Sequence, residues 1–585
     1  FSAEQRELLK YQKSNGTWSG LINTLRKALD DSDFDGSLLS YYSRVVKKLP
    51  VRKDVLLDTG PWKLSSSWST NFWRLSYNHN ARAGVPFECK DKVTPVEFAK
   101  GAVDAQVLYN LFQTYSGEEV FDRLLDVSPY YLVTRLANKT AVYEAKKILE
   151  KTRPYYIYPL ATRLLGSYYY QNMKDRVSFL ESDESESMLG FSWFYGGSGK
   201  LLAKIAEAPE DVIKKFYYSD DMYIFVRKGH HVKMCSPDFS HMDGSVRDAH
   251  IELNTRFDKM RVLLHGGSEA DVRAIVFLNK VATTHIVSAT GHLMYFKDSG
   301  LSSGHSNTTG VNQTVSAVAS CVIDDLVAEH KIDFESFEKL MDLYPDAVLE
   351  KVGLVVKPGT EEVRFGKIHL EVGDVFPLNF LSQNLGCLES RGKRVIVPFP
   401  ALTSLCRAYA FAPGALPGDD PYAERMSRAI GICLCGGFYY PKFYDMLVVD
   451  FNAALKSLGK DKSTSSKGIT DSHLGELATQ FDVAAQRLYG EVFHTIDVAI
   501  LKRHNWNKGF APRDWFIQLF AEHPEFDEPE KVVEKKAKVS KPKLSLAQLK
   551  VGKGRPSSEI VARTTKQKNA VEEKSSKNEA FLAAL

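Results

Sequence analysis

The chain has 585 residues, of which 44% are hydrophobic, 25% charged and 11% aromatic, and its formal net charge is +4. This composition excludes a collagen-like, coiled-coil or wholly disordered chain, and no apolar run reaches the ~18 residues of a membrane-spanning helix. The seven cysteines are scattered, which excludes a disulfide framework and favours a reducing compartment. Cys433 and Cys435 are close together, but a lone C-x-C is a weak sign of a metal site, so we expect buried apolar packing.

The elements predicted along the chain put helices on both sides of a strand-rich centre. In order, the patterns predict short helices and loops over 1–60, a helix-rich region over 95–175, strands over 210–240, a helix over 308–330, one helix with several strands over 336–400, and helices over 400–525. Helical flanks around a strand-rich centre predict a large α+β protein with a central sheet.

The end of the chain, 531–585, differs in charge from the rest. It carries 14 Lys and Arg against 5 Asp and Glu, and it has few large apolar residues. Such a stretch cannot bury enough surface to offset its ordering entropy, so we predict a basic mobile tail. The sequence leaves two roles open for this tail, an arm that binds RNA or a partner and a solubilising segment.

The most informative stretch, 214–243, reads KKFYYSDDMYIFVRKGHHVKMCSPDFSHMD. Two strand-like runs flank the polar Ser219-Asp220-Asp221, which predicts a β-hairpin with acids at its turn. A second turn and a third strand follow before Pro237. The segment is therefore predicted to be a three-stranded meander.

In this meander the first and third strands run in the same direction, which places Asp220, Asp221 and Asp238 on one sheet edge. Neighbouring strands are ~4.8 Å apart, so carboxylates at their ends can share a cation. Close carboxylates repel one another unless a positive charge lies between them, and such oxygen ligands suit Mg²⁺ or Mn²⁺. Two ions ~3.5–4 Å apart would serve phosphoryl transfer. The alternative is an ordinary acidic turn beside an unrelated strand-end aspartate.

A second polar motif, DSGLSSGHSNTTGVNQ, occupies 298–313. A flexible Gly-rich loop leads here into a helix, and polar residues four apart share one face of that helix. Such a face could contact a sugar hydroxyl, and an acid five residues after Asp238 could accept a hydrogen bond from a ribose 2′-OH. The predicted nucleotide-binding residues of these two motifs are Asp243, Ser303, Gly304, Thr308 and Asn312.

These motifs resemble those of the viral RNA-dependent RNA polymerases. PDFSHMD (237–243) is similar to motif A, SGHSNTTGVN (303–312) to motif B, and YYSDDMY (217–223) to motif C, the metal-binding hairpin. Motif C precedes motif A, and this permuted order C–A–B is similar to that of the permutotetravirus and birnavirus polymerases. The meander tolerates this order, because the hairpin still neighbours the motif A strand. Birnavirus polymerases carry Ala-Asp-Asn at motif C, so Ser-Asp-Asp favours the permutotetravirus side.

The resemblance implies further site residues with weaker signatures. Gly84 and Pro86 lie in a segment similar to motif G, which guides the template into the site. Lys151 and Arg153 end a basic segment similar to motif F and would hold the incoming triphosphate by charge-assisted hydrogen bonds. A solvated helix face is the alternative for this basic segment.

Two later segments resemble motifs D and E. Lys357 follows a helix–Gly–strand pattern like that of motif D, whose lysine is the proposed general acid for pyrophosphate. Residues 376–385 have the weak signature of the primer-grip hairpin, motif E.

Two other pairs of acids compete for the role of motif C. Gly418-Asp419-Asp420 lies between two prolines, which cannot donate to a sheet ladder, so we predict a loop there that leads into a helix. Asp324-Asp325 follows Asn312 by only twelve residues and is expected inside the motif B helix.

The implied fold is α+β, a right-hand polymerase whose central antiparallel palm sheet carries the permuted motif C. The predicted domains are an N-terminal extension (1–60), fingers with motifs G and F (61–210), palm with motifs C and A (211–260), a fingers insertion (261–290), palm with motifs B, D and E (291–395), thumb (396–530) and the basic mobile tail (531–585).

The implied activity is RNA-templated RNA synthesis by a viral replicase in the host-cell cytoplasm. Asp220, Asp221 and Asp238 would hold two Mg²⁺ or Mn²⁺ ions, and the partners would be an RNA template, a primer or product strand and ribonucleoside triphosphates. The oligomeric state stays open, with a dimer as one possibility, as does the mode of priming.

Two other functions compete with this one. A reverse transcriptase matches Tyr218-Ser219-Asp220-Asp221, but the motif order and the ribose-favouring Asp243 oppose it. A non-catalytic RNA-binding scaffold on a polymerase fold is disfavoured, because both predicted metal ligands and the ribose-sensing acid are all present.

Overall fold

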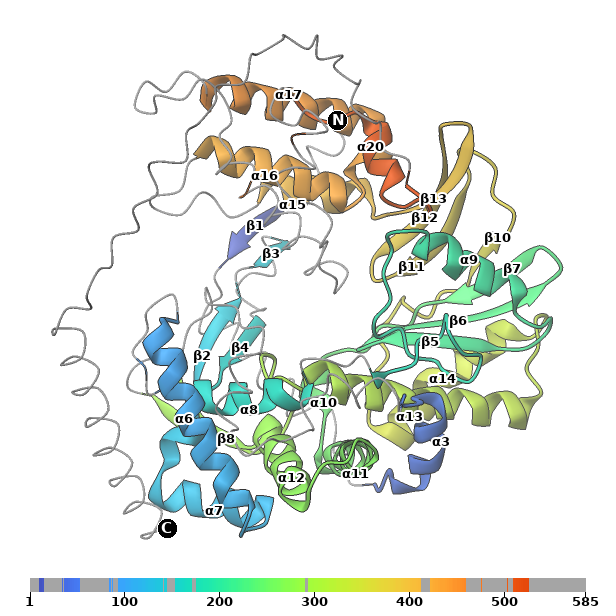
Figure 1. Ribbon diagram of the computed structural model, residues 1–585. Helices are drawn as coiled ribbons and strands as arrows, with labels where there is room; N and C mark the ends of the chain where they lie inside the picture. Colours follow the sequence, from blue (N-terminus) through green and yellow to red (C-terminus); the bar gives the residue numbers. More distant parts are fainter. Residues whose placement is uncertain are drawn as a thin grey trace, which may run out of the picture.

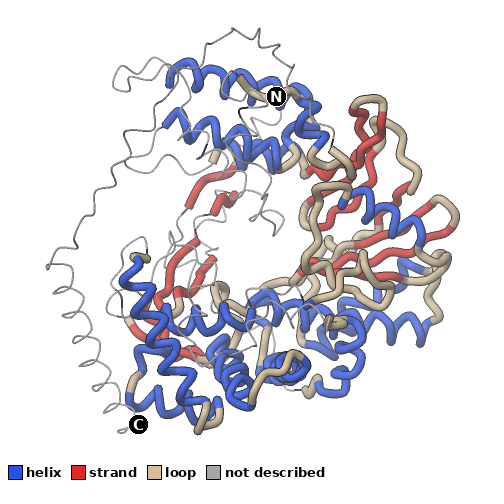
Figure 2. The backbone as a smooth tube through the Cα atoms, viewed as in Figure 1, coloured by secondary structure: helices blue, strands red, loops and turns tan. Residues whose placement is uncertain are grey.

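The computed structural model describes residues 10–14, 34, 36–52, 84–85, 87, 93–139, 141–144, 153–170, 175–289, 293–411, 421–458, 475, 502 and 509–524. The predicted basic tail, Lys151, Pro86 and Gly418-Asp419-Asp420 lie outside these residues. Strands gather in two separate places and helices pack around them (Figure 2). No helix of the described part of the chain is both long and apolar enough to cross a membrane.

The palm sheet has four antiparallel strands in the order β10-β7-β6-β5. Its strands are β5 (Lys214–Tyr218), β6 (Asp221–Lys228), β7 (His231–Cys235) and β10 (Arg364–Lys367). The first three pair in chain order, which confirms the predicted meander. Met222 to Val226 are all buried, because both faces of the sheet are covered.

One face of the palm sheet packs on helices (Figure 1). Side chains at alternate positions, such as Met222, Ile224 and Val226, share a core with these helices. The elements of this layer are η1 (Leu39–Tyr41), α3 (Tyr42–Lys48), α10 (Met242–Ser245), α11 (Asp248–Leu264), α13 (Thr308–His330) and α14 (Phe337–Val352). The predicted N-terminal extension thus contributes 38–49 to the palm core.

The other face packs on a second antiparallel sheet, β11-β12-β13, and on the thumb. The elements here are α9 (Gly197–Glu207), β11 (Val375–Phe380), β12 (Gln383–Ser390), β13 (Lys393–Phe399), α15 (Leu402–Ala410), α16 (Pro421–Leu434), η5 (Gly437–Tyr439), α17 (Pro441–Leu458) and α20 (Arg513–Gln518). The hairpin β11–β12 spans the segment that resembles motif E.

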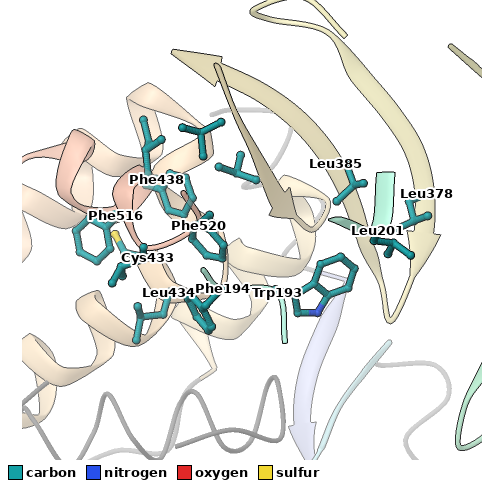
Figure 3. Packing of buried hydrophobic residues seen from close by; sticks show 14 of the residues in the cluster. Trp193, Phe194, Leu201, Leu378, Leu385, Cys433, Leu434, Phe438, Phe516 and Phe520 are labelled. Carbon is teal, nitrogen blue, oxygen red and sulfur yellow. The ribbon is translucent and has the colours of Figure 1, made fainter. Parts of the chain in front are cut away.

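Segments far apart in sequence meet in this thumb-side core (Figure 3). Phe194 stacks on Phe520 with ring centroids 4.7 Å apart, and the Tyr195 N–H donates to the Leu519 carbonyl at 3.0 Å. Residues 179–208, within the predicted fingers range, therefore share a core with palm and thumb. Cys433 is fully buried in the same core, as the sequence predicted.

The fingers form a third core around a mixed sheet of order β4-β2-β8-β9, in which only β2 and β8 are parallel. Its elements are α6 (Pro95–Phe112), α7 (Gly117–Val127), η2 (Pro129–Leu132), β2 (Val133–Lys139), β4 (Arg153–Ile157), α8 (Leu160–Tyr170), α12 (Glu269–Thr283), β8 (His285–Ser288) and β9 (Met294–Lys297). The predicted insertion 261–290 packs here through α12 and β8. Capping boxes begin α6, α7 and α12, which fixes where these helices start.

A short two-stranded sheet lies between the fingers and the thumb (Figure 1). Strand β1 (Tyr11–Ser14) pairs antiparallel with β3 (Ala141–Glu144). The Arg407 guanidinium of α15 lies over the Tyr11 ring, 4.7 Å from its centroid. The N-terminal strand therefore contacts both regions.

A buried polar cluster joins α11 to the start of α13. Arg261 of α11 forms ion pairs with Asp175 and with Asp258, and all three side chains are at most 1% exposed. The Asp258 carboxylate also accepts hydrogen bonds of 2.9 Å from the amides of Asn254 and Asn307. Asn307 is the residue before α13, so this cluster anchors the beginning of that helix.

Candidate active site

The predicted acids lie at one end of the palm sheet. Asp220 and Asp221 form the end of the β5–β6 hairpin, where Tyr218 pairs with Asp221. Strand β7 pairs antiparallel with β6, so the chain leaves β7 toward the same end and reaches Asp238 three residues later. The meander thus brings all three acids to one edge, as the sequence predicted.

The acids perturb one another's ionisation. Asp221 is exposed to solvent, but the surrounding protein and then the charges of Asp220 and Asp238 raise its pKa to about 7. The pKa of Asp220 is also raised, chiefly by the surrounding protein, with contributions from the charges of Asp243 and Asp238. Acids that destabilise one another's charge in this way are suited to a cation.

The chemistry of this donor set fits a hard divalent cation, because it offers carboxylate oxygens that repel one another. The three acids lie near one another but are not arranged in the geometry of a complete metal site. Within the described ranges, no group of three His, Cys, Asp or Glu side chains has metal-binding geometry. Shared coordination by Asp220, Asp221 and Asp238 therefore stays a prediction.

Lys357 lies directly against Asp238. Its ammonium is 3.0 Å from the Asp238 carboxylate, and its backbone N–H donates to the Asp238 carbonyl at 2.7 Å. The Thr360 hydroxyl accepts a 3.0 Å bond from the Asp238 N–H and donates to the Lys357 carbonyl at 2.7 Å. The segment after α14, which resembles motif D, is thus fixed beside motif A.

Asp243 is the point where motifs A and B meet. Its carboxylate accepts hydrogen bonds from the Ser303 hydroxyl at 2.5 Å and from the Asn312 amide at 3.2 Å. Asn312 also lies 3.4 Å from the Ser219 hydroxyl, next to the acids of motif C. Asp243 is therefore in direct contact with two other predicted nucleotide-binding residues, Ser303 and Asn312.

The loop that carries Ser303 is docked on the fingers strand β4. The Tyr156 N–H donates to the Ser303 carbonyl at 2.8 Å. Gly304 has φ +107°, and a Cβ there would lie 2.4 Å from the Tyr156 carbonyl oxygen, so only glycine fits. The Thr308 hydroxyl donates to the Ser302 and His305 carbonyls at 3.1 and 3.0 Å, and so stabilises this loop.

The described residues of the segments predicted to guide the template and to hold the triphosphate lie at opposite ends of β4. Gly84 has φ +76°, and a Cβ there would lie 2.4 Å from the Tyr158 carbonyl oxygen, just beyond β4. Arg153 begins β4 and is exposed. Lys151 and Pro86 fall outside the described residues, so their predicted roles stay predictions.

The competing acids of the motif B helix have a different environment. Asp324 of α13 pairs with Lys48 at 2.7 Å and also with Lys215, and Asp325 pairs with Arg44 at 2.7 Å. These acids tie α13 to α3 and to β5. They serve as structural ion pairs, which agrees with their exclusion as motif C.

Sequence reasoning overlooked Gln313 and Ser316, which contact the motif C turn from α13. A signal existed, because α13 is buried almost all round and yet carries several polar residues. Buried polar groups need hydrogen-bond partners, so each such residue marks a specific contact.

Comparison with known proteins agrees with this architecture. The birnavirus polymerase VP1 of infectious pancreatic necrosis virus superposes with a TM-score of 0.64 at 16% identity, covering 88% of this chain and 71% of that one. The birnavirus VP1–VP3 complex superposes with a TM-score of 0.65 at 17% identity and the same coverage. At these identities the likeness defines the fold, which is that of the right-hand RNA polymerases.

The family is defined by sequence. The model of the permutotetravirus RNA-dependent RNA polymerase palm domain matches residues 39–381, more than half of the chain. The chain belongs to this family and is an RNA-directed RNA polymerase. Enzymes of this kind use divalent cations and bind RNA and ribonucleoside triphosphates. A search of curated protein sequences finds no significant match.

Proposed function

We propose that the chain synthesises RNA by a two-metal mechanism at the end of the palm sheet where Asp220, Asp221 and Asp238 lie. The observation that carries this proposal is the contact of Asp243 with Ser303 and Asn312 beside these acids. A carboxylate held in this way is suited to accept a hydrogen bond from a ribose hydroxyl. The site would therefore select ribonucleotides over deoxyribonucleotides.

Each residue has a separate role in this proposal. Asp220, Asp221 and Asp238 would hold Mg²⁺ or Mn²⁺, which when bound stabilises the charge on the attacking and leaving oxygens. Lys357 would hold a proton on its Nζ for the pyrophosphate leaving group, after exchanging its contact with Asp238 for one with the phosphate.

The fingers supply the remaining predicted contacts. Lys151 and Arg153 would hold the triphosphate, and Gly84 and Pro86 would line the path of the template. The host-cell cytoplasm is the compartment we propose for this activity. The basic tail is a further proposed contact for RNA phosphates, whose binding would weaken with salt.

The test is primer extension on an RNA template with Mg²⁺ or Mn²⁺ and separate pools of ribo- and deoxyribonucleotides. Wild type is compared with Asp220→Ala and Asp419→Ala. Ribonucleotide incorporation lost only in Asp220→Ala supports the permuted site. Loss only in Asp419→Ala would place the metal site at the downstream Gly-Asp-Asp. A wild type inactive even with a preformed primer would favour the non-catalytic scaffold.

A further inference from the structure

The turn that carries Asp220 contains an unfavourable backbone conformation. Tyr218 and Asp221 are paired, so Ser219 and Asp220 form a two-residue hairpin loop. Ser219 has φ +57°, whereas Asp220 is not among the residues with positive φ. Positive φ at the first loop position only is the pattern of a type II′ turn, which favours glycine at that position. A serine there needs compensation from its surroundings.

Helix α13 supplies this compensation by contacting each polar group of Ser219. The Gln313 side-chain oxygen accepts from the Ser219 N–H at 2.8 Å, and the Ser316 hydroxyl donates to the Ser219 carbonyl at 2.7 Å. The Asn312 amide lies 3.4 Å from the Ser219 hydroxyl. The conformation of the turn is thus determined by a helix roughly 90 residues later in the chain.

Both the oxygen and the nitrogen of the Gln313 side-chain amide form hydrogen bonds in this arrangement. Gln313 is fully buried, and its amide nitrogen donates to the Tyr217 carbonyl at 3.2 Å and to the Ser187 hydroxyl at 3.0 Å. The Gln313 side chain therefore connects the end of β5, the turn at Ser219 and the loop residue Ser187. Since none of these groups is a predicted nucleotide contact, the geometry gives Gln313 no direct role in substrate binding.

We infer that Gln313 and Ser316 are positioning residues, which hold Ser219 in the left-handed conformation so that Asp220 faces the site. This inference rests on the proposed function, because it assigns the orientation of a proposed metal ligand. Its consequence is kinetic: loss of either contact should lower the rate of nucleotide addition with little change in the apparent KM for nucleotide.

The first experiment uses a matched pair of serines on α13. Ser316 and Ser320 are both fully buried and each donates one hydrogen bond, Ser316 to the Ser219 carbonyl and Ser320 to the Glu186 carboxylate. In single-turnover addition to a preformed primer–template, Ser316→Ala should lower the maximal rate roughly tenfold. Ser320→Ala should stay within roughly twofold of wild type. Equal effects of the two substitutions would overturn the inference.

The second experiment tests the backbone argument by rescue. Gln313→Met keeps the side-chain length but removes both hydrogen-bonding groups, and should lower the maximal rate roughly tenfold to a hundredfold. Glycine adopts positive φ without cost, so in a Ser219→Gly background Gln313→Met should cost several-fold less. An unchanged cost in that background would show that Gln313 acts only on general stability.

A third measurement does not depend on activity. Hydrogen exchange of the peptide covering 216–222 should be faster in Gln313→Met than in wild type, and unchanged in Ser320→Ala. Unchanged exchange in Gln313→Met would overturn the inference even if wild type proved inactive. An inactive wild type with faster exchange in Gln313→Met would refute the proposed function but support the contact.

Discussion

Aspartates in two regions of the molecule have pKa values shifted in opposite directions. Burial acts to raise the pKa of Asp175, but Arg261, the nearby His265 and Arg176 together hold it well below its usual range. At the palm edge, the surrounding protein and the neighbouring acids raise the pKa of Asp221 to about 7. Among the described residues, the ion pair formed by the palm-edge acids is the one between Asp238 and Lys357.

This difference distinguishes charge used for structure from charge used for chemistry. Asp175 and Asp258 are matched by Arg261 and by amides inside the protein, so their charges are compensated without a ligand. The palm-edge acids repel one another, and in the proposed function a divalent cation would compensate their charges. The same residue type thus supports folding at one site and is proposed to bind a ligand at the other.

The largest effect is expected from removal of the buried arginine. Arg261→Met would remove the cation that pairs with both buried Asp175 and Asp258 and should cost about 3–5 kcal/mol of unfolding free energy. Denaturant unfolding monitored by tryptophan fluorescence measures this cost. A loss below about 1 kcal/mol would mean that the cluster is not the structural element described here.

Asp238→Asn should affect activity and not stability, the opposite of the effect expected for Arg261→Met. It should lower the rate of nucleotide addition at least about a hundredfold, or ~2.7 kcal/mol in activation free energy, because a proposed metal ligand is lost. Its unfolding free energy should not fall, since the substitution removes repulsion among the acids. Single-turnover kinetics and denaturant unfolding test the two halves. A marked loss of stability would instead place Asp238 with the structural acids.

A buried titratable group that is kept neutral provides an intermediate case. The His250 Nδ1 accepts from the Arg247 N–H at 3.1 Å, so its Nε2 donates to the Val352 carbonyl at 2.9 Å. Burial, with the nearby charge of Arg247, lowers its pKa to about 4.

Between pH ~6.5 and ~4, His250 is therefore protonated in the unfolded chain but neutral in the native protein. The contribution of His250 to the unfolding free energy should be fully present above pH ~6.5 and should decrease as the pH falls. At pH 5 the loss from this residue should be about 2 kcal/mol. Denaturant unfolding at pH 7 and pH 5 should show a smaller difference in His250→Asn than in wild type. An equal difference in the two proteins would exclude His250 as the cause.

The smallest effect on stability is expected at Lys357. Its pair with Asp238 is about half exposed on both sides, at 55% and 44%. Lys357→Met should change the unfolding free energy by less than about 1 kcal/mol, and added salt should reduce even that. A cost similar to that of Arg261→Met would contradict the distinction between the two groups of charges.

The sequence predicted the elements that depend on local pattern. The meander followed from apolar runs around a polar turn, and the helix expected over 308–330 coincides with α13. The contacts of Asp243 with Ser303 and Asn312 agree with the grouping of motifs A and B.

The sequence did not predict contacts that depend on tertiary packing. The packing of 179–208 against the thumb and the pairing of β1 with β3 have no periodic signal, because their partners lie far away in the chain. The hydrogen bonds of Gln313 with the turn were overlooked for the same reason. Residues with exact partners at long sequence separation become visible only in three dimensions.

The permuted order also sets the sequence of events during synthesis. Strands β5, β6 and β7 pair with one another in chain order, so the acid-bearing meander can form locally, soon after it leaves the ribosome, before β10 is added to the sheet. The Gln313 amide that holds Ser219 is translated 94 residues later. At a translation rate of about 5–20 residues per second, Gln313 is synthesised on the order of 5–20 s after the turn. The nascent chain therefore completes the hairpin that carries Asp220 well before it can form the contacts of that hairpin with α13.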